Sequence, residues 1–222
     1  MNTDLNKPLT LISTVHIPTA DAELEGDLHI PEGATGLVLF VHGSGSSRFS
    51  PRNQYVADLL NQAGLATLLF DLLTEQENQV DLQTREYRFD IDLLSRRTIA
   101  AIDWITQQPE TKFLPIGLFG ASTGAAAALI AAQARPKAVK CVVSRGGRPD
   151  LSMPALIEVA APTLLIVGGL DHDVLKLNQM AQKAMQAPCE LTVINGATHL
   201  FEEPGTLDLA ANIAKKWFLQ KL

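Results

Sequence analysis

A serine between two glycines is the residue of this chain best suited to nucleophilic chemistry. Ser122 lies in Gly120-Ala121-Ser122-Thr123-Gly124, which matches the pattern G-x-S-x-G. The apolar run that ends at Phe119 is typical of a buried parallel strand, and the alanine-rich run after Gly124 favours a helix. The pattern therefore predicts a tight reversal over Gly120 to Gly124, with the serine hydroxyl exposed at its apex.

A serine hydroxyl becomes a good nucleophile only when a base takes its proton and an acid orients that base. His199 and Asp171 are the candidate base and acid, because each follows a predicted strand and the order serine, acid, histidine is typical of this turn. Asp173, and after it Asp150, are the alternatives for the acid. We expect the three catalytic side chains at one edge of a sheet.

Attack on a carbonyl produces a negative oxygen, which needs hydrogen-bond donors that are already in place. The backbone N–H groups of Thr123 and Ser44 are the candidates, the second from the small-residue loop after an early strand. The glycines around Ser44 would let its amide point into the site. We expect His42 to brace this loop rather than to transfer protons.

Arginines gather where the substrate would bind, in a chain that is acidic overall. Arg145 and Arg148 follow the strand next to the Ser122 strand, and Arg48 and Arg52 follow the Ser44 loop. Guanidinium groups hold carboxylates or phosphates through paired hydrogen bonds, so Arg145, Arg148 and Arg48 are candidate substrate-binding residues for an anionic group. The alternative is that these arginines pair with acids such as Asp150, Asp90 or Glu86 and fasten loops.

The apolar pattern predicts an α/β fold in which a mostly parallel sheet carries an antiparallel N-terminal hairpin and helices on both faces. The hairpin is expected over Leu9 to Ile17 and Ala22 to Ile30, and residues 75–92 are expected to form a long surface loop. The remaining expected strands are Gly36 to Val41, Leu65 to Phe70, Leu114 to Phe119, Val139 to Ser144, Thr163 to Val167 and Glu190 to Ile194. The expected helices are Pro51 to Ala63, Leu93 to Gln107, the run after Gly124, Val174 to Met185 and Leu207 to Lys221.

Length and composition favour one domain over residues 1–222, with no lid domain because the segment from Ser144 to Thr163 is short. The formal net charge is −6 and no basic tract occurs, so we expect neither nucleic acid nor a membrane as a partner. Asp4 and Lys7 near the start, without an apolar segment, predict a cytoplasmic protein. Two cysteines are too few for a disulfide framework, and we expect no metal or cofactor. The oligomeric state is left open.

Four segments carry a resemblance to the α/β-hydrolase superfamily and, within it, to the dienelactone-hydrolase-like group. They are Val41-His42-Gly43-Ser44-Gly45, residues 119–125 around Ser122, Val167-Gly168-Gly169-Leu170-Asp171 and Gly196-Ala197-Thr198-His199-Leu200-Phe201. The chain is also similar to hydrolase domains fused to phosphoribosyltransferases, although we expect no such second domain in these residues. Members that act on dienelactones carry cysteine where this chain has Ser122. The resemblance therefore implies a serine hydrolase of small esters or related acyl compounds and names no substrate.

Two other functions compete with this interpretation. Gly43-Ser44-Gly45 followed by a helix, with Asp71 after the next strand, could be a dinucleotide-binding fingerprint of an oxidoreductase, but Arg48 occupies the third glycine position. The fold could instead serve as a binding module without turnover. Protection of the protein by NAD would favour the oxidoreductase. Failure of Ser122 to react with a fluorophosphonate would favour the binding module.

Overall fold

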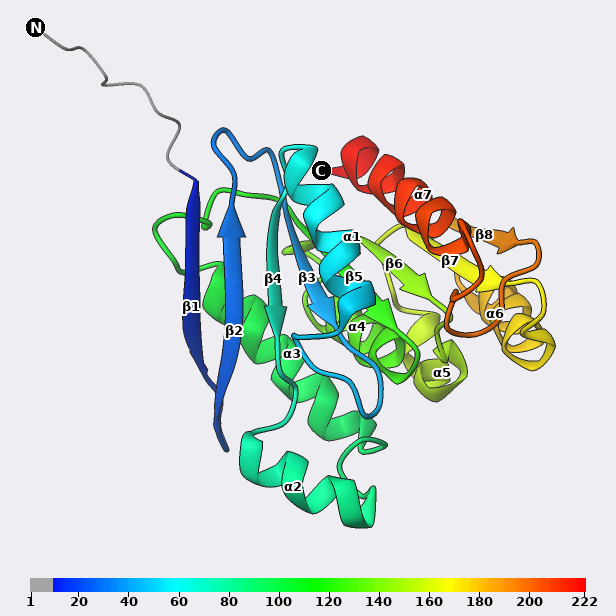
Figure 1. Cartoon of the computed structure of the whole chain (residues 1–222), viewed down its shortest axis with the longest axis horizontal. Coiled ribbons are helices and arrows are strands. Elements are labelled where there is room, and N and C mark those ends of the chain that lie inside the picture. Colours follow the sequence, from blue (N-terminus) through cyan, green and yellow to red (C-terminus); the bar gives the residue numbers. More distant parts are fainter. Residues whose placement is uncertain (1–9) are drawn as a thin grey trace, which may run out of the picture.

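The computed structural model describes residues 10–222, in which eight strands form one sheet in the order β1-β2-β4-β3-β5-β6-β7-β8 (Figure 1). Only β1, β2 and β4 pair in an antiparallel way, and the strands from β4 to β8 are parallel. The strands are β1 (Leu11–Pro18), β2 (Glu23–Ile30), β3 (Leu37–Val41), β4 (Ala66–Phe70), β5 (Ile116–Ala121), β6 (Val139–Arg145), β7 (Thr163–Gly168) and β8 (Cys189–Ile194). The predicted mostly parallel sheet with an N-terminal hairpin is confirmed, and the expected first residue of the hairpin, Leu9, lies outside the described residues, as do Asp4 and Lys7.

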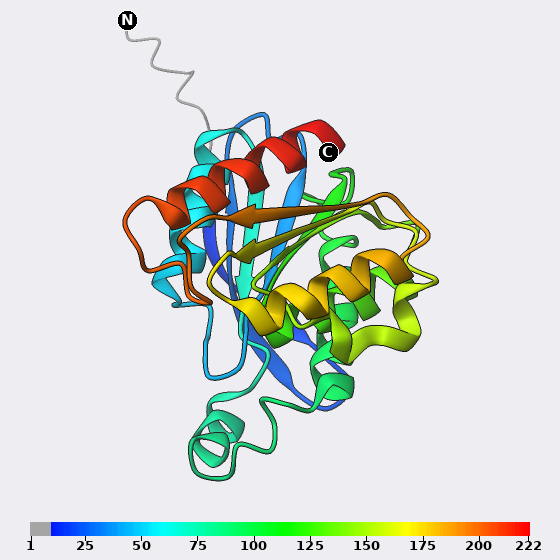
Figure 2. The same ribbon diagram turned by 90° about the vertical axis from the view of Figure 1, so that its right-hand side faces the viewer.

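Helices cover both faces of the sheet, as predicted. They are α1 (Pro51–Gln62), α2 (Glu75–Thr84), α3 (Ile91–Ile105), α4 (Thr123–Ala134), α5 (Met153–Leu156), α6 (His172–Ala184) and α7 (Thr206–Lys221). Helices α1 and α7 pack on one face, and α3, α4 and α6 pack on the other, so that the sheet lies between α7 and α6 (Figure 2). Along β3 the side chains alternate between the two cores, with Leu39 in one and Phe40 in the other.

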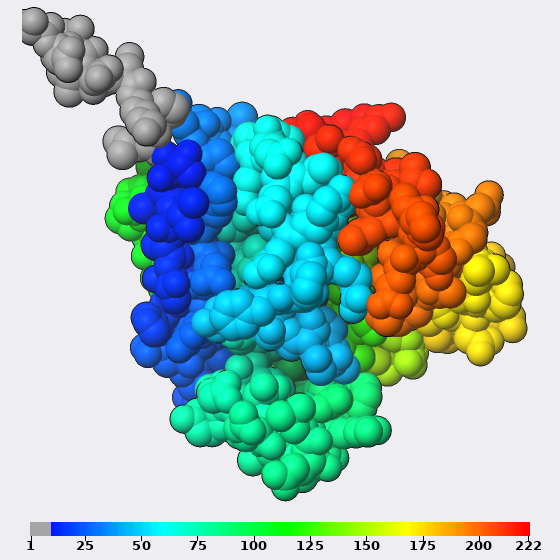
Figure 3. All heavy atoms as spheres, in the orientation of Figure 1, coloured from blue at the N-terminus to red at the C-terminus, as the bar shows by residue number. Residues whose placement is uncertain are grey.

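The prediction of a loop over residues 75–92 is wrong for its first half, which forms α2. Thr74 begins this helix with a capping box: its hydroxyl accepts from the Glu77 N–H, and the Glu77 carboxylate accepts from the Thr74 N–H. Asp81 is the only buried residue of the helix. The sequence shows no helical period because α2 does not pack on a core. Figure 3 shows this segment projecting from the bottom of the body.

The segment between β6 and β7 contains only a short 3₁₀ helix (Pro149–Ser152) and α5. The prediction that no lid domain is inserted at this point of the described chain is confirmed. Among residues 10–222, none of the helices combines the length and apolar character needed to span a membrane.

Candidate active site

The turn that carries Ser122 is tighter than the sequence predicted. Strand β5 extends to Ala121 and α4 begins at Thr123, so Ser122 alone makes the reversal. Its φ of 50° and ψ of −123° lie outside the regions that L-residues favour, which is a strained conformation of the kind found at active sites. The packing of the buried strand β5 and the buried helix α4 imposes this conformation and places the serine at the carboxyl edge of the sheet.

Two glycines allow this turn to pack closely. A Cβ atom on Gly120 would lie 2.5 Å from the Cα of Ala125, and one on Gly124 would lie 2.2 Å from the carbonyl oxygen of Val41. Any larger residue at either position would push α4 away from the sheet. The glycines of the G-x-S-x-G pattern are therefore explained by the contact of helix with strand.

His199 and Asp171 are brought together by the ends of β8 and β7. The Nδ1 atom of His199 lies 2.6 Å from Oδ2 of Asp171, within hydrogen-bond distance. The alternative acids are engaged elsewhere: the exposed Asp173 lies 3.5 Å from the Lys176 ammonium, and Asp150 pairs with Arg148. Of the three candidate acids, Asp171 is the one in contact with the histidine.

The segment after β6 connects the serine and the histidine. The Ser122 N–H donates to the carbonyl of Arg145 at 3.3 Å, and a Cβ atom on Gly146 would lie 3.2 Å from the His199 carbonyl oxygen and 3.6 Å from its ring. Within residues 10–222 no hydrogen bond joins the Ser122 hydroxyl to His199. Catalytic hydrogen bonds are often long before a substrate is bound, so this separation is compatible with a working pair.

The loop after β3 differs from the expectation for an oxyanion hole. The Ser44 N–H, expected to be free, donates to Thr123 Oγ1 at 3.0 Å, and the two hydroxyl oxygens lie 2.8 Å apart. The Ser44 hydroxyl also donates to the carbonyl of Arg88 at 2.9 Å. The amide of Ser44 is therefore held by the Thr123 side chain. The G-x-S-x-G pattern indicates a role for the backbone of Thr123 only and does not reveal this contact.

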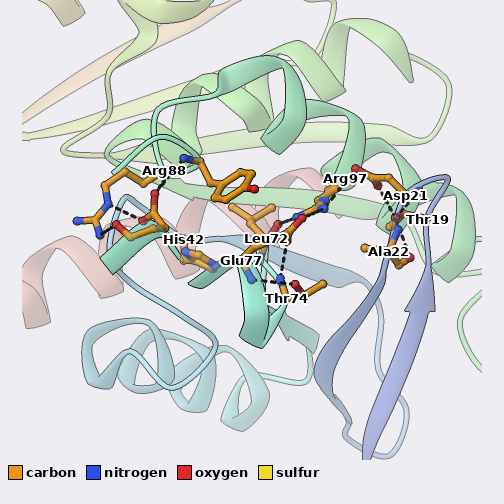
Figure 4. Close-up of polar contacts among 11 residues, drawn as sticks. Thr19, Asp21, Ala22, His42, Leu72, Thr74, Glu77, Arg88 and Arg97 are labelled. Carbon is orange, nitrogen blue, oxygen red and sulfur yellow. Dashed lines mark hydrogen bonds and ion pairs between the residues drawn. The ribbon is translucent and has the colours of Figure 1, made fainter. Parts of the chain in front are cut away.

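His42 fastens this loop to the end of β4, as expected. Its Nε2 accepts from the N–H of Leu72 at 3.0 Å (Figure 4). Its Nδ1–H donates to the carbonyl of Gly43 at 3.0 Å, and the two bonds together require the neutral ring. Burial lowers the pKa of His42, although the hydrogen bond to Gly43 and the charge of Asp71 act in the opposite direction. His42 therefore positions the loop in its uncharged form.

The candidate arginines fall into two groups. Arg48 forms ion pairs with Asp71, Glu25 and Asp27, and Arg148 forms two hydrogen bonds with Asp150, of 2.7 and 2.8 Å. These contacts fasten loops, so substrate binding by Arg48 or Arg148 stays a prediction that the structure does not favour.

Arg145 differs from both. Its side chain is buried, and no carboxylate among residues 10–222 forms an ion pair with it.

A cavity of about 440 Å³ opens beside the Ser44 loop. Its wall includes Gly43 and Ser44 but neither Ser122 nor His199, and α2 with the segments around it forms the far side. Acidic side chains outnumber basic ones in the wall, with Glu23, Glu25, Asp71, Glu75 and Asp81 against Arg48 and Arg88. This wall favours a neutral, hydroxyl-bearing or cationic group over an anion.

Arg97 on α3 anchors the segment that forms this wall. Its guanidinium is 1% exposed and bonds both carboxylate oxygens of Glu77 at 2.6 and 2.7 Å, the carbonyl of Leu72 and the carboxylate of Asp21 (Figure 4). Although burial opposes it, the hydrogen bond from Arg97 lowers the pKa of Glu77. Sequence reasoning missed this residue because its three partners come from segments far apart in the chain.

A family model described as "Alpha/beta hydrolase domain" matches residues 34–215. The chain belongs to this family. A solved structure named as a dienelactone hydrolase from Anabaena variabilis is 55% identical to it, covers 96% of this chain and 99% of its own, and has a TM-score of 0.94. Est1E from Butyrivibrio proteoclasticus is 16% identical, covers 94% of this chain and 98% of its own, and has a TM-score of 0.79, a likeness of fold alone.

Two curated relatives from Mycobacterium tuberculosis strains are each 54% identical over 208 residues, which is 94% of this chain. Both are named "Putative phosphoribosyl transferase". The chain spans about half of their length, 46% of each. The likeness to hydrolase domains of phosphoribosyltransferase-like proteins, expected from the sequence, is confirmed.

Proposed function

We propose that this protein is a serine hydrolase that cleaves a small ester or related acyl compound through Ser122, His199 and Asp171. The observation that carries the proposal is the 2.6 Å contact of His199 Nδ1 with Asp171 Oδ2 at the same sheet edge as the strained Ser122. A nucleophile, a base and an orienting acid are the parts that acyl transfer needs. Membership of the α/β-hydrolase family supports the reaction class.

In this mechanism the Ser122 Oγ attacks the carbonyl carbon of the ester and its proton passes to Nε2 of His199. Asp171 accepts the Nδ1–H of His199, which fixes the ring and stabilises its charged form. Collapse of the tetrahedral intermediate breaks the bond to the alcohol, which leaves with the proton from His199, and an acyl-enzyme remains on Ser122. Water, deprotonated by His199, then releases the acid by the same steps.

The oxyanion of the tetrahedral intermediate would be held by the N–H of Thr123, which follows the nucleophile at the start of α4. The second donor in this proposal is the Ser44 N–H, and it becomes available only if Thr123 Oγ1 turns away from it. The Ser44 loop would therefore complete its donor pair when substrate binds.

A fluorophosphonate probe tests the proposal directly, because only an activated serine reacts with it quickly. We expect the wild type to gain the mass of one phosphonyl group and to hydrolyse p-nitrophenyl acetate, and the Ser122→Ala variant to do neither. Equal ester hydrolysis by the wild type and the Ser122→Ala variant would refute the assignment. Circular dichroism of both proteins would show whether the fold is retained.

A lactone is a second candidate substrate, because the 55% identical structure is named as a dienelactone hydrolase. A lactone is an internal ester, so the same side chains would open it. The freed alcohol would stay joined to the acyl group through the carbon chain, and hydrolysis of the acyl-enzyme would release a single hydroxy acid. Comparing kcat/KM for dihydrocoumarin and phenyl acetate would distinguish a preference for cyclic esters from one for open esters. The transferase named for the longer mycobacterial relatives stays a property of those proteins, since this chain spans only 46% of each.

A further inference from the structure

The guanidinium of Arg145 is buried without a protein partner at the carboxyl end of β6. The residue is 8% exposed, and its Nη1 atom is inaccessible and makes no hydrogen bond within residues 10–222. Nor does any carboxylate in this range form an ion pair with it. Buried polar groups are nearly always satisfied, and an unpaired charge is costly, so a further species is needed to complete the contacts of this side chain.

The surroundings of Arg145 are positive and aromatic rather than acidic. Its Cζ lies 5.7 Å from the centre of the Phe119 ring. Burial, followed by the charge of the nearby Arg52, lowers the pKa of Arg145 to about 10, so the group still carries its charge at neutral pH. The Nε atom of Arg52, in the first turn of α1, is also buried without a hydrogen-bond partner in residues 10–222.

The backbone at Arg145 and the loop that Arg52 contacts both lie at the candidate active site. The carbonyl of Arg145 accepts the N–H of Ser122, and the next residue, Gly146, lies against His199. Arg52 contacts Glu202, in the loop that follows His199, at 3.3 Å. Because Glu202 is exposed and this contact is single, an incoming anion could replace it at little cost.

We propose that Arg145, assisted by Arg52, binds an oxyanion group of the substrate, a carboxylate or a phosphate, beside Ser122. This inference rests on the proposed hydrolase function and adds the substrate class. Arg145 has no carboxylate partner in residues 10–222 and Arg52 has only the exposed Glu202, so both guanidinium groups can form charge-assisted hydrogen bonds with the oxygens of such a group. The acidic cavity beside Ser44, whose wall does not include Arg145, would repel the same group, so the charges orient the substrate with its anionic end toward Arg145.

A pair of esters matched in leaving group and chain length tests this inference. The p-nitrophenyl monoester of succinic acid carries a carboxylate, and p-nitrophenyl butyrate does not. In the wild type we expect the succinate ester to be hydrolysed with the higher kcat/KM. In the Arg145→Met variant we expect kcat/KM for the succinate ester to fall by about 10- to 100-fold, while kcat/KM for the butyrate ester changes by less than about 3-fold.

Two variants serve as controls for charge and for folding. Lys140→Met removes one positive charge from the exposed opposite end of β6, about 16 Å from Arg145 along the strand, and should leave the ratio of the two esters unchanged. Arg52→Met alters the accessible half of the site and should lower the succinate ester's kcat/KM by a smaller factor. Its result keeps the test informative if Arg145→Met does not fold.

A binding measurement separates this inference from the proposed function, because it needs no turnover. In a Ser122→Ala background, acetate and inorganic phosphate should raise the melting temperature, and Arg145→Met should abolish the shift. Absence of a shift with either anion would overturn the site. A shift without any preference between the two esters would show that the site takes a free anion, and would overturn its assignment to the substrate.

Discussion

His199 contacts Asp171 through its Nδ1 atom at 2.6 Å, whereas Asp173, two residues further on, lies on the exposed side of α6 near Lys176. This difference makes a matched pair of variants possible. Asp171→Asn should lower kcat by about 10⁴-fold, because the amide cannot stabilise the charged ring. Asp173→Asn, which removes the same charge, should stay within about 2-fold of the wild type in the same p-nitrophenyl acetate assay. Equal loss in both variants would contradict the choice of acid.

Gly146→Ala should disturb the histidine loop. Gly146 has a φ of 53°, and a methyl group there would lie 3.2 Å from the His199 carbonyl oxygen. We expect a loss of about 1 to 3 kcal/mol in the free energy of unfolding and a fall in kcat of at least about 10-fold. Gly33→Ala is the control, because Gly33 has a φ of 66° and open space around it. If Gly33→Ala lowers kcat as much, contact with His199 is not the cause.

Acidification should weaken the fold through His42. The pKa of His42 in the folded protein lies below the ordinary value of 6.5. The neutral ring therefore contributes fully to the free energy of unfolding above pH 6.5, and this contribution is lost as the pH falls through the folded-state pKa. Urea unfolding of the wild type between pH 7 and pH 5 should show stability falling by up to about 1.4 kcal/mol per pH unit from this group. His42→Gln should have a shallower slope, and the exposed His16→Gln should keep the wild-type slope.

Arg97→Met should strongly destabilise the protein, because it leaves the Glu77 carboxylate, which takes two of its hydrogen bonds, without this partner. Breaking a buried ion pair from one side costs about 3 to 5 kcal/mol, measurable from urea unfolding curves. Arg96→Met is the matched control, since the neighbouring Arg96 is exposed on the same helix. We expect it to change stability by less than about 0.5 kcal/mol. A small effect of Arg97→Met would mean that α2 is held by other contacts.

The sequence predicted those parts of the fold that depend on short, local residue patterns. Apolar runs located the central strands β3 to β7 because these are buried on both faces. The G-x-S-x-G pattern located the turn because helix and strand can approach so closely only at glycine. The pairing of His199 with Asp171 could be anticipated from chain order, since parallel strands end at one edge.

Features that depend on contacts between distant segments could not be predicted. Helix α2 was not predicted because its residues have no apolar face. In the sequence, only the capping box of Thr74 and Glu77 marks its start. The occupied Ser44 amide depends on a side chain 79 residues away in the sequence. The positions of the arginines in the sequence also did not show that Arg148 forms an ion pair with Asp150, or that Arg145 is buried without a carboxylate partner in residues 10–222.

Helix α2 rests on the body through polar anchors and adds no large side chain to either core, with Val80 and Leu82 left exposed. Its composition can therefore be varied with little cost to folding as long as Glu77 and Asp81 are kept. Because the helix also lines the cavity beside Ser44, it is a natural place for a combinatorial library that exchanges the outer wall of the cavity. Changes in selectivity could then be evolved separately from the scaffold that holds Ser122, His199 and Asp171.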